Sequence, residues 1–122
     1  MGTLDERNPS LWVGTTEETG YPSLSGDVDT DVVVVGAGIT GLTAAALLKQ
    51  GGRRVVVVEA GRVASGVTGY TTAKLAVLHG LIYDDLASAF GEDGARQYAG
   101  ANLAGIAQVG TLVDRYGIDC DL

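Results

Sequence analysis

The stretch VVVVGAGITGLTAA, Val32 to Ala45, places four valines before a Gly-Ala-Gly turn and then an apolar run. β-Branched residues favour a strand, and the leucines and alanines from Ile39 to about Gln50 have helical spacing that ends at Gly51-Gly52. Arg54 to Val58 repeats the strand signal. The sequence therefore predicts a βαβ unit with parallel strands, whose first strand, Asp31 to Val35, is buried on both faces because its apolar run is unbroken.

Three glycines with a fixed spacing, Gly36-x-Gly38-x-x-Gly41, join the first predicted strand to the helix. Gly36 permits the tight turn, Gly38 lets the backbone approach a pyrophosphate, and Gly41 lets the helix pack close to the strand. The N–H groups of Ile39 and Thr40 at the helix start are expected to point at that anion. The fold class is therefore α/β, a Rossmann-like βαβ unit that binds FAD or NAD(P), with helices following it.

Glu59 ends the second predicted strand, eighteen residues after Gly41. A carboxylate at this point accepts hydrogen bonds from the hydroxyls of an adenosine ribose, and it repels a 2′-phosphate, so NAD or FAD is favoured over NADP. The alternative is a solvated glutamate at the end of a strand.

The rest of the chain shows weaker patterns. Residues 1–30 show no hydrophobic periodicity. They contain a short apolar group around Trp12, through which this arm is expected to dock. Residues 61–80, rich in glycine and threonine, show little sign of regular structure. Apolar spacing predicts a short helix over Leu81 to Phe90 and a longer one from Glu92 to Tyr116, ended by Gly117.

Composition narrows the possible partners. The net charge of −7 makes nucleic acid and anionic membrane surfaces unfavourable partners. The sequence contains one cysteine, Cys120, and one histidine, His79, so neither an intramolecular disulfide nor a metal site is expected. Because the first residues also lack a signal-peptide pattern, the expected location is cytoplasmic. Cys120 lies between two aspartates, whose negative charges disfavour the thiolate that a nucleophile needs, so we expect it to be structural. The uncharged run Val32–Leu48 is interpreted as a strand and a helix, so no membrane span is expected.

Residues 31–74, DVVVVGAGITGLTAAALLKQGGRRVVVVEAGRVASGVTGYTTAK, resemble the FAD-dependent oxidoreductases of the D-amino-acid oxidase and glycine oxidase superfamily. The segments EAGRVASGVTGYTTAKLAVLHGLIY and GIDCD are similar to a bacterial branch in which a Rieske iron–sulfur domain follows the FAD domain. The resemblance runs from about Ser10 to the last residue. It implies that the cofactor is FAD.

The resemblance also implies positions along that cofactor. Residues at the pyrophosphate and the adenine ribose would be Gly36, Gly38, Ile39, Thr40 and Glu59. Residues flanking the adenosine would be Ala60 and Arg62, and those along the ribityl and phosphate side Ser65, Gly66 and Thr68. Residues near the flavin would be Thr71, Thr72, Ala73 and Lys74. The alternatives are an ordinary polar loop for the hydroxyl residues and a plain surface position for the lysine.

Such enzymes are several times longer than this chain, and their substrate domain would lie beyond Leu122. We therefore expect an arm, residues 1–30, and the N-terminal part of an FAD-binding domain, residues 31–122, inactive by itself. The intact enzyme would transfer a hydride from an amine or amino-acid-like substrate to FAD, with electrons passing to oxygen or an iron–sulfur domain. Catalytic residues are not assigned; His79 is either a proton shuttle or, more simply, a packed or surface residue. An NAD-linked dehydrogenase domain and a noncatalytic dinucleotide-binding module are the alternative functions.

Overall fold

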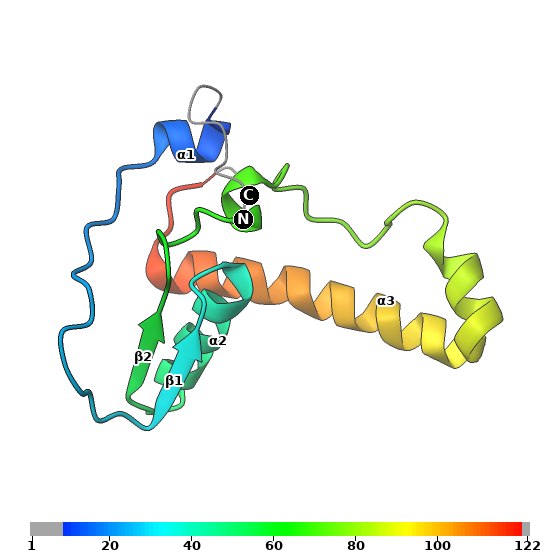
Figure 1. Cartoon of the computed structure of the whole chain (residues 1–122). Coiled ribbons are helices and arrows are strands. Elements are labelled where there is room, and N and C mark those ends of the chain that lie inside the picture. The colour runs from blue at the N-terminus through cyan, green and yellow to red at the C-terminus, as the bar shows by residue number, and fades with distance from the viewer. Residues whose placement is uncertain (1–8, 121–122) are drawn as a thin grey trace. The chain divides into compact units, whose positions relative to one another are not determined.

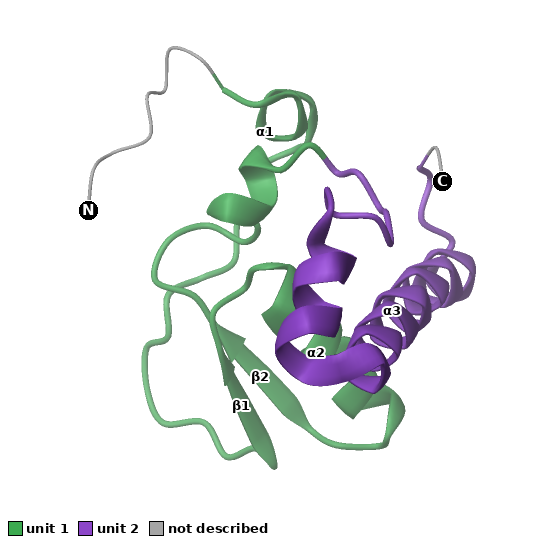
Figure 2. Cartoon of the chain, turned by 90° about the vertical axis from the view of Figure 1, so that its right-hand side faces the viewer, with its two compact units in different colours: residues 1–72 green, residues 73–122 purple. Residues whose placement is uncertain are grey.

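The computed structural model of the chain describes residues 9–120 (Figure 1). In chain order its elements are α1 (Leu11–Thr15), β1 (Val32–Val35), α2 (Ile39–Gln50), β2 (Val55–Val58), the 3-10 helix η1 (Val67–Tyr70) and α3 (Ile82–Tyr116). They fall into two compact units, the first ending at Thr72 and the second beginning at Ala73 (Figure 2).

The first unit contains the predicted βαβ arrangement. β1 and β2 are parallel and in register, from Val32 opposite Val55 to Val35 opposite Val58, and α2 packs against them (Figure 1). The helix has its predicted bounds, and each strand is one residue shorter at its start than predicted. The α/β class and the parallel sheet are therefore confirmed.

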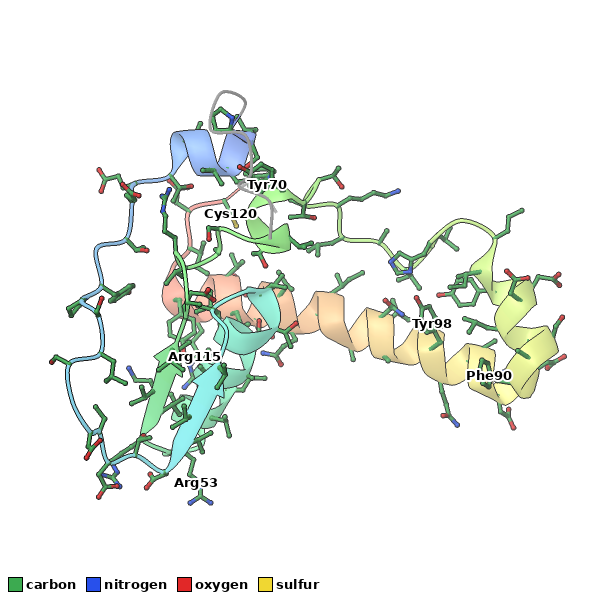
Figure 3. All side chains as sticks on the ribbon, in the orientation of Figure 1. Arg53, Tyr70, Phe90, Tyr98, Arg115 and Cys120 are labelled. Carbon is green, nitrogen blue, oxygen red and sulfur yellow. The ribbon has the colours of Figure 1, made fainter. Side chains whose placement is uncertain are left out.

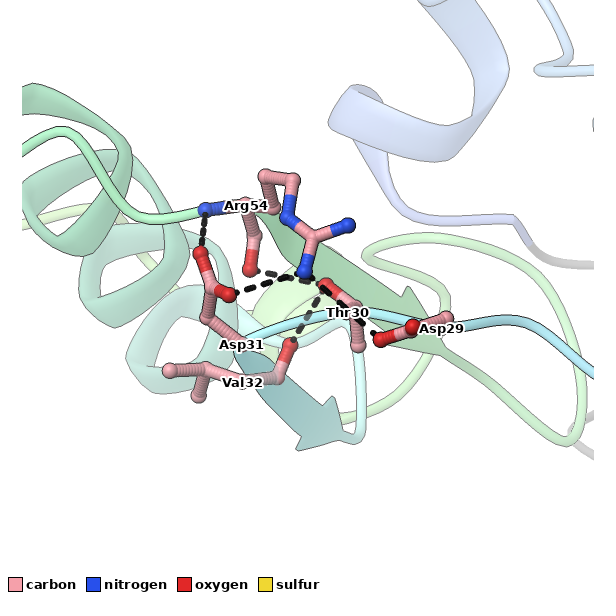
Figure 4. Close-up of polar contacts among 5 residues, drawn as sticks. All are labelled: Asp29, Thr30, Asp31, Val32 and Arg54. Carbon is pink, nitrogen blue, oxygen red and sulfur yellow. Dashed lines mark hydrogen bonds and ion pairs between the residues drawn. The ribbon is translucent and has the colours of Figure 1, made fainter.

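Asp31 and Arg54, the residues that the strands leave out, join the two strands at their start (Figure 4). The Asp31 carboxylate accepts from the Arg54 Nη2 at 3.0 Å and from the Arg54 backbone N–H at 2.8 Å. The Arg54 guanidinium, more than the backbone N–H, holds the pKa of Asp31 below its ordinary value. Thr30 adds a hydroxyl that donates to the Arg54 carbonyl at 2.7 Å. Side chains thus fix the start of the register that the valines continue.

The two faces of the sheet differ, which corrects the prediction that the first strand is buried on both. α2 lies on the Val34 face, whereas Val33 and Val35, on the opposite face, are 54% and 85% exposed. In the described part of the first unit, an extended segment containing Leu24 and Val28 borders this second face and leaves a hollow of about 380 Å³. The prediction was wrong because unbroken valines show that both faces are apolar, and do not show that both are covered.

Two short elements of the first unit had not been predicted. In α1 the Ser10 hydroxyl accepts from the Val13 N–H at 3.2 Å and so caps the helix start. η1 gives one turn of structure to the glycine- and threonine-rich segment. α1 packs on η1, so the arm does dock, as the Trp12 signal had predicted.

The second unit is built on α3, which departs from helical geometry at Gly91, with φ 72° and ψ 170°. This break separates the two helices that the sequence predicts, and Gly117 ends the second with φ 57°. Figure 3 shows Phe90 next to the bend and Tyr98 on the long helix after it. Tyr98 packs edge-on against Tyr83, and its hydroxyl lies 3.2 Å from the His79 Nδ1. The two tyrosine rings therefore pack against each other.

Candidate dinucleotide-binding site

A hollow of about 490 Å³ lies where the chain leaves the carboxyl ends of β1 and β2. Ligands of open α/β sheets bind at these strand ends, and the volume suits a small-molecule pocket. It is lined by Ala37, Gly38, Glu59, Ala60, Gly61, Arg62, Ala64, Ser65, Gly66, Val67 and Thr68. The glycine turn, the segment after β2 and η1 therefore contribute to one site.

Two of the three motif glycines, Gly36 and Gly41, meet a geometric requirement. Gly36 has a φ of 101°, a backbone conformation that residues with a side chain rarely adopt. Its N–H donates to the Val58 carbonyl at 2.7 Å. A Cβ on Gly41 would overlap the Gly36 carbonyl oxygen and would lie 3.2 Å from the Val34 side chain. Gly41 thus permits the close packing of α2 on β1 that its place in the motif predicts.

The start of α2 lies beside a hydroxyl of η1. The Ile39 N–H donates to the Thr68 Oγ1 at 2.9 Å, and a Cβ on Gly38 would lie 3.2 Å from the same oxygen. Thr40 follows in the first helical turn. The Thr68 oxygen thus accepts from the N–H that the sequence predicts will bind a pyrophosphate, and an anion there would compete with this hydroxyl or share the donor with it.

Glu59 is held from two sides. Its Oε2 accepts from the Ala37 N–H at 2.7 Å and its Oε1 from the Gly61 N–H at 2.9 Å. The Ala37 N–H first, and the Gly61 N–H second, hold the pKa of Glu59 below its ordinary value, so the side chain is charged at neutral pH. Because each carboxylate oxygen has more than one lone pair, both retain capacity for ligand hydroxyls.

Other predicted residues are brought to the hollow in varying degree. The hollow is lined by Ala60, Arg62, Ser65 and Gly66. The Ser65 hydroxyl donates to the Arg62 carbonyl at 2.8 Å. The Arg62 Nε also lies 3.0 Å from the carboxylate of Glu18 in the arm. These residues share one pocket, and their contacts to the cofactor stay predictions.

The residues predicted nearest the flavin lie at the boundary between the units. The Thr71 carbonyl accepts from the Trp12 indole, and Thr72 is the last residue of the first unit. Ala73, with a φ of 55°, and Lys74 belong to the second unit. Their part in holding a flavin therefore stays a prediction.

Four lining residues were not predicted: Ala37, Gly61, Ala64 and Val67. Ala37 stands between two motif glycines, a position that could have indicated its proximity to the ligand, and it is 1% exposed. Ala64 has a φ of 57° and its N–H donates to the Ala37 carbonyl at 2.9 Å. Nothing in the sequence marks an alanine for that conformation.

Residues 9–120, which the structure describes, contain neither a metal-binding cluster nor a membrane-spanning helix. Among them no group of three or more histidine, cysteine or acidic side chains is placed to hold a metal ion. No helix in the same range combines the length and the apolar character that a membrane span requires.

Comparison with known proteins gives a family match over residues 31–122, to the family described as DAO, FAD dependent oxidoreductase. The chain is 40% identical over 116 residues to the Rieske 2Fe-2S iron–sulfur protein YhfW of Bacillus subtilis, a match that covers 95% of this chain. It is 34% identical over 101 residues to gamma-glutamylputrescine oxidoreductase of Escherichia coli and 32% identical over 103 residues to the oxidoreductase OrdL of Haemophilus influenzae, covering 83% of this chain in both cases.

These matches extend over 23%, 24% and 23% of the relatives' own lengths. The chain thus spans about a quarter of the curated relatives it matches. No solved structure matches it significantly.

Proposed function

The chain belongs to the family of FAD-dependent oxidoreductases, whose cofactor is FAD, and from this premise we propose that its first unit binds the ADP half of FAD in the hollow beside Gly38 and Glu59. The pyrophosphate would lie at the start of α2, against the N–H groups of Ile39 and Thr40. The adenine ribose would lie at Glu59. Ala60 and Arg62 would border the adenosine.

One observation supports this placement above the others: the Ala37 and Gly61 N–H groups fix the Glu59 carboxylate in a hollow that Gly38 of the glycine turn also lines. A carboxylate fixed in this way does not have to be ordered when a ribose binds, so its hydrogen bonds add to affinity at little entropic cost. Its charge disfavours a 2′-phosphate. The family match favours an FAD-dependent oxidoreductase over the two alternatives, an NAD-linked dehydrogenase domain and a noncatalytic dinucleotide-binding module.

The substrate and the electron acceptor are finer proposals. We propose an amine or amino-acid-like substrate, which the similarity to a gamma-glutamylputrescine oxidoreductase supports. The similarity to a Rieske 2Fe-2S protein supports an iron–sulfur domain as electron acceptor, with oxygen as the alternative. FAD, when bound, supplies the hydride acceptor, while the residues of this chain bind and orient it. Cytoplasmic location and inactivity of the 122-residue chain alone stay predictions.

The test uses the product of the complete gene that encodes this sequence, called the full-length protein below. Oxidised flavin absorbs visible light and NAD does not, so the visible spectrum of the purified protein identifies the cofactor. We expect a flavin spectrum and, in the Glu59→Gln variant, an affinity for FAD lower by roughly tenfold to a hundredfold. Glu17→Gln, which neutralises an exposed glutamate of the arm, is the matched control and should bind FAD like the parent. Equal affinity in all three proteins would contradict the ribose role of Glu59.

A further inference from the structure

We propose that residues 10–18 of the arm act as a brace that holds the FAD-binding loop, residues 59–72, in its binding conformation, with Trp12 as a positioning residue. The inference rests on the proposed function, because it assigns the arm a role at the same site. It is carried by four contacts that cross between the brace and the loop, all within the first unit.

Two of the contacts are hydrogen bonds to loop carbonyls. The Ser10 hydroxyl donates to the Gly69 carbonyl while it also accepts from the Val13 N–H. The Trp12 Nε1 donates to the Thr71 carbonyl at 2.8 Å. Ser10 therefore caps α1 and also binds the loop, so the short helix and the loop conformation depend on each other.

The third contact is close packing at Gly69. This glycine is buried, and a Cβ added to it would lie 2.5 Å from the Ala64 carbonyl oxygen and 3.0 Å from the Val13 Cγ2. The loop backbone is therefore enclosed between its own Ala64 turn and the brace. Interiors packed this closely transmit small displacements.

The fourth contact is the ion pair between Glu18 and Arg62, at 3.0 Å. The side chains of Arg62 and Glu18 are 47% and 71% exposed, so solvent screens the pair and its contribution to stability is small. Its effect is on position, because Arg62 lines the hollow and the pair sets where its guanidinium lies.

The brace reaches the start of α2 through Thr68. Its carbonyl contacts, at Gly69 and Thr71, lie one and three residues after Thr68, whose hydroxyl accepts from the Ile39 N–H. Without the brace, η1 loses its external support, and the loop that lines the hollow is no longer held in one conformation. FAD would then have to order the loop on binding, which lowers its apparent affinity.

The experiment compares Trp12→Ala, Trp12→Phe and Ser10→Ala with the parent in the full-length protein. Amide hydrogen exchange without FAD is followed in residues 64–72 and, as an internal reference, in β1 and β2. We expect roughly tenfold faster exchange in the loop of each variant and unchanged exchange in the strands. Trp12→Phe keeps an aromatic ring without the N–H, so it isolates the hydrogen bond even if Trp12→Ala disturbs the fold.

Affinity for FAD is measured by flavin fluorescence on the same proteins, and a roughly tenfold loss is expected in all three variants. Glu18→Gln and Glu17→Gln form a matched pair, since both neutralise an exposed arm glutamate and Glu18 alone of the two contacts Arg62 in the described structure.

The outcomes separate the two proposals. A parent that binds no FAD overturns the proposed function, while loop exchange still decides whether the brace holds the loop. Loop exchange in Trp12→Phe and Ser10→Ala equal to that of the parent overturns the brace, whatever the affinity for FAD.

Discussion

At the residue scale, the Glu59 carboxylate joins the turns that follow both strands, through the Ala37 N–H on one side and the Gly61 N–H on the other. The sequence predicts a carboxylate at the end of β2 because the fold delivers one to the ribose there. It does not predict the two backbone donors, because their direction depends on how the turns after β1 and β2 approach each other. The bonds to Glu59 are therefore a property of the folded chain.

These donors give stability a pH dependence. Because the folded-state pKa of Glu59 is below its ordinary value of 4.5, the stabilising contribution is complete above that value. As the pH falls below 4.5, the unfolded chain takes up the proton first, and the contribution is lost as the pH falls through the lowered pKa. Asp31, whose pKa is lowered from 3.8 by Arg54, acts in the same direction over a slightly more acidic range.

We predict that the urea unfolding midpoint of the full chain falls between pH 5 and pH 3 and that Glu59→Gln makes this fall shallower. Glutamine cannot be protonated in this range, and its amide would place N–H groups against the Ala37 or the Gly61 N–H. The control is Glu17→Gln, expected to leave the profile as in the parent. Identical slopes for Glu59→Gln and the parent would show that these bonds are not linked to folding.

Gly38→Val tests the space at the helix start. The backbone of Gly38 has a φ of −81°, so valine fits its conformation, but the new Cβ would lie 3.2 Å from the Thr68 Oγ1 and in the path of a pyrophosphate. We expect loss of FAD affinity of at least about a hundredfold with an unchanged far-ultraviolet circular dichroism spectrum. Gly20→Val, at a glycine with open space around it, should bind FAD normally. If the Gly38→Val variant bound FAD as tightly as the parent, the proposed position of the pyrophosphate at this turn would be contradicted.

At the element scale, the bend in α3 depends on Gly91, whose φ of 72° and ψ of 170° are essentially restricted to glycine. We predict that Gly91→Ala lowers the free energy of unfolding by about 1–3 kcal/mol. Gly100→Ala, in the regular part of the same helix with open space at the Cβ, should raise it by about 0.5–1 kcal/mol. Urea denaturation of both variants checks the opposite signs, and equal effects would contradict the assigned origin of the bend.

Elements were predictable to the extent that their own residues determine them. β1, α2 and β2 carry clear periodicities, and Gly91 interrupts the helical pattern of α3 where the chain bends. α1 and η1 are too short to be stable alone, and each is held by the other through the Ser10 and Trp12 bonds to loop carbonyls. A pattern confined to one segment cannot reveal contacts between residues 59 positions apart.

At the scale of the whole molecule, the sheet face opposite α2 is a determinant of solubility. Val33 and Val35 are exposed there, and Ala37 is the one apolar residue that the described part of the chain buries almost completely. Exposed apolar surface beside unpaired strand edges favours association.

We predict that the 122-residue chain expressed alone self-associates with rising concentration and that the double variant Val33→Thr, Val35→Thr reduces this. Threonine keeps the strand preference of valine and adds a solvated hydroxyl. Sedimentation velocity over a range of concentrations is the measurement. Val67→Thr makes the same change at a valine that is 90% exposed outside the sheet, and should leave association unchanged. A chain that stays monomeric without substitution would contradict the prediction.

The separation of brace and loop along the chain has a consequence for the order of folding. The bonds from Ser10 and Trp12 each close a ring of chain that spans 59 positions and contains the whole of β1, α2 and β2. Closing so long a ring has a large entropic cost unless its interior is already compact, and the shorter loop between β1 and β2 closes at a lower cost. We therefore expect the strands and helix to assemble before the brace docks, so that the loop after β2 takes its final conformation late in the folding of the first unit.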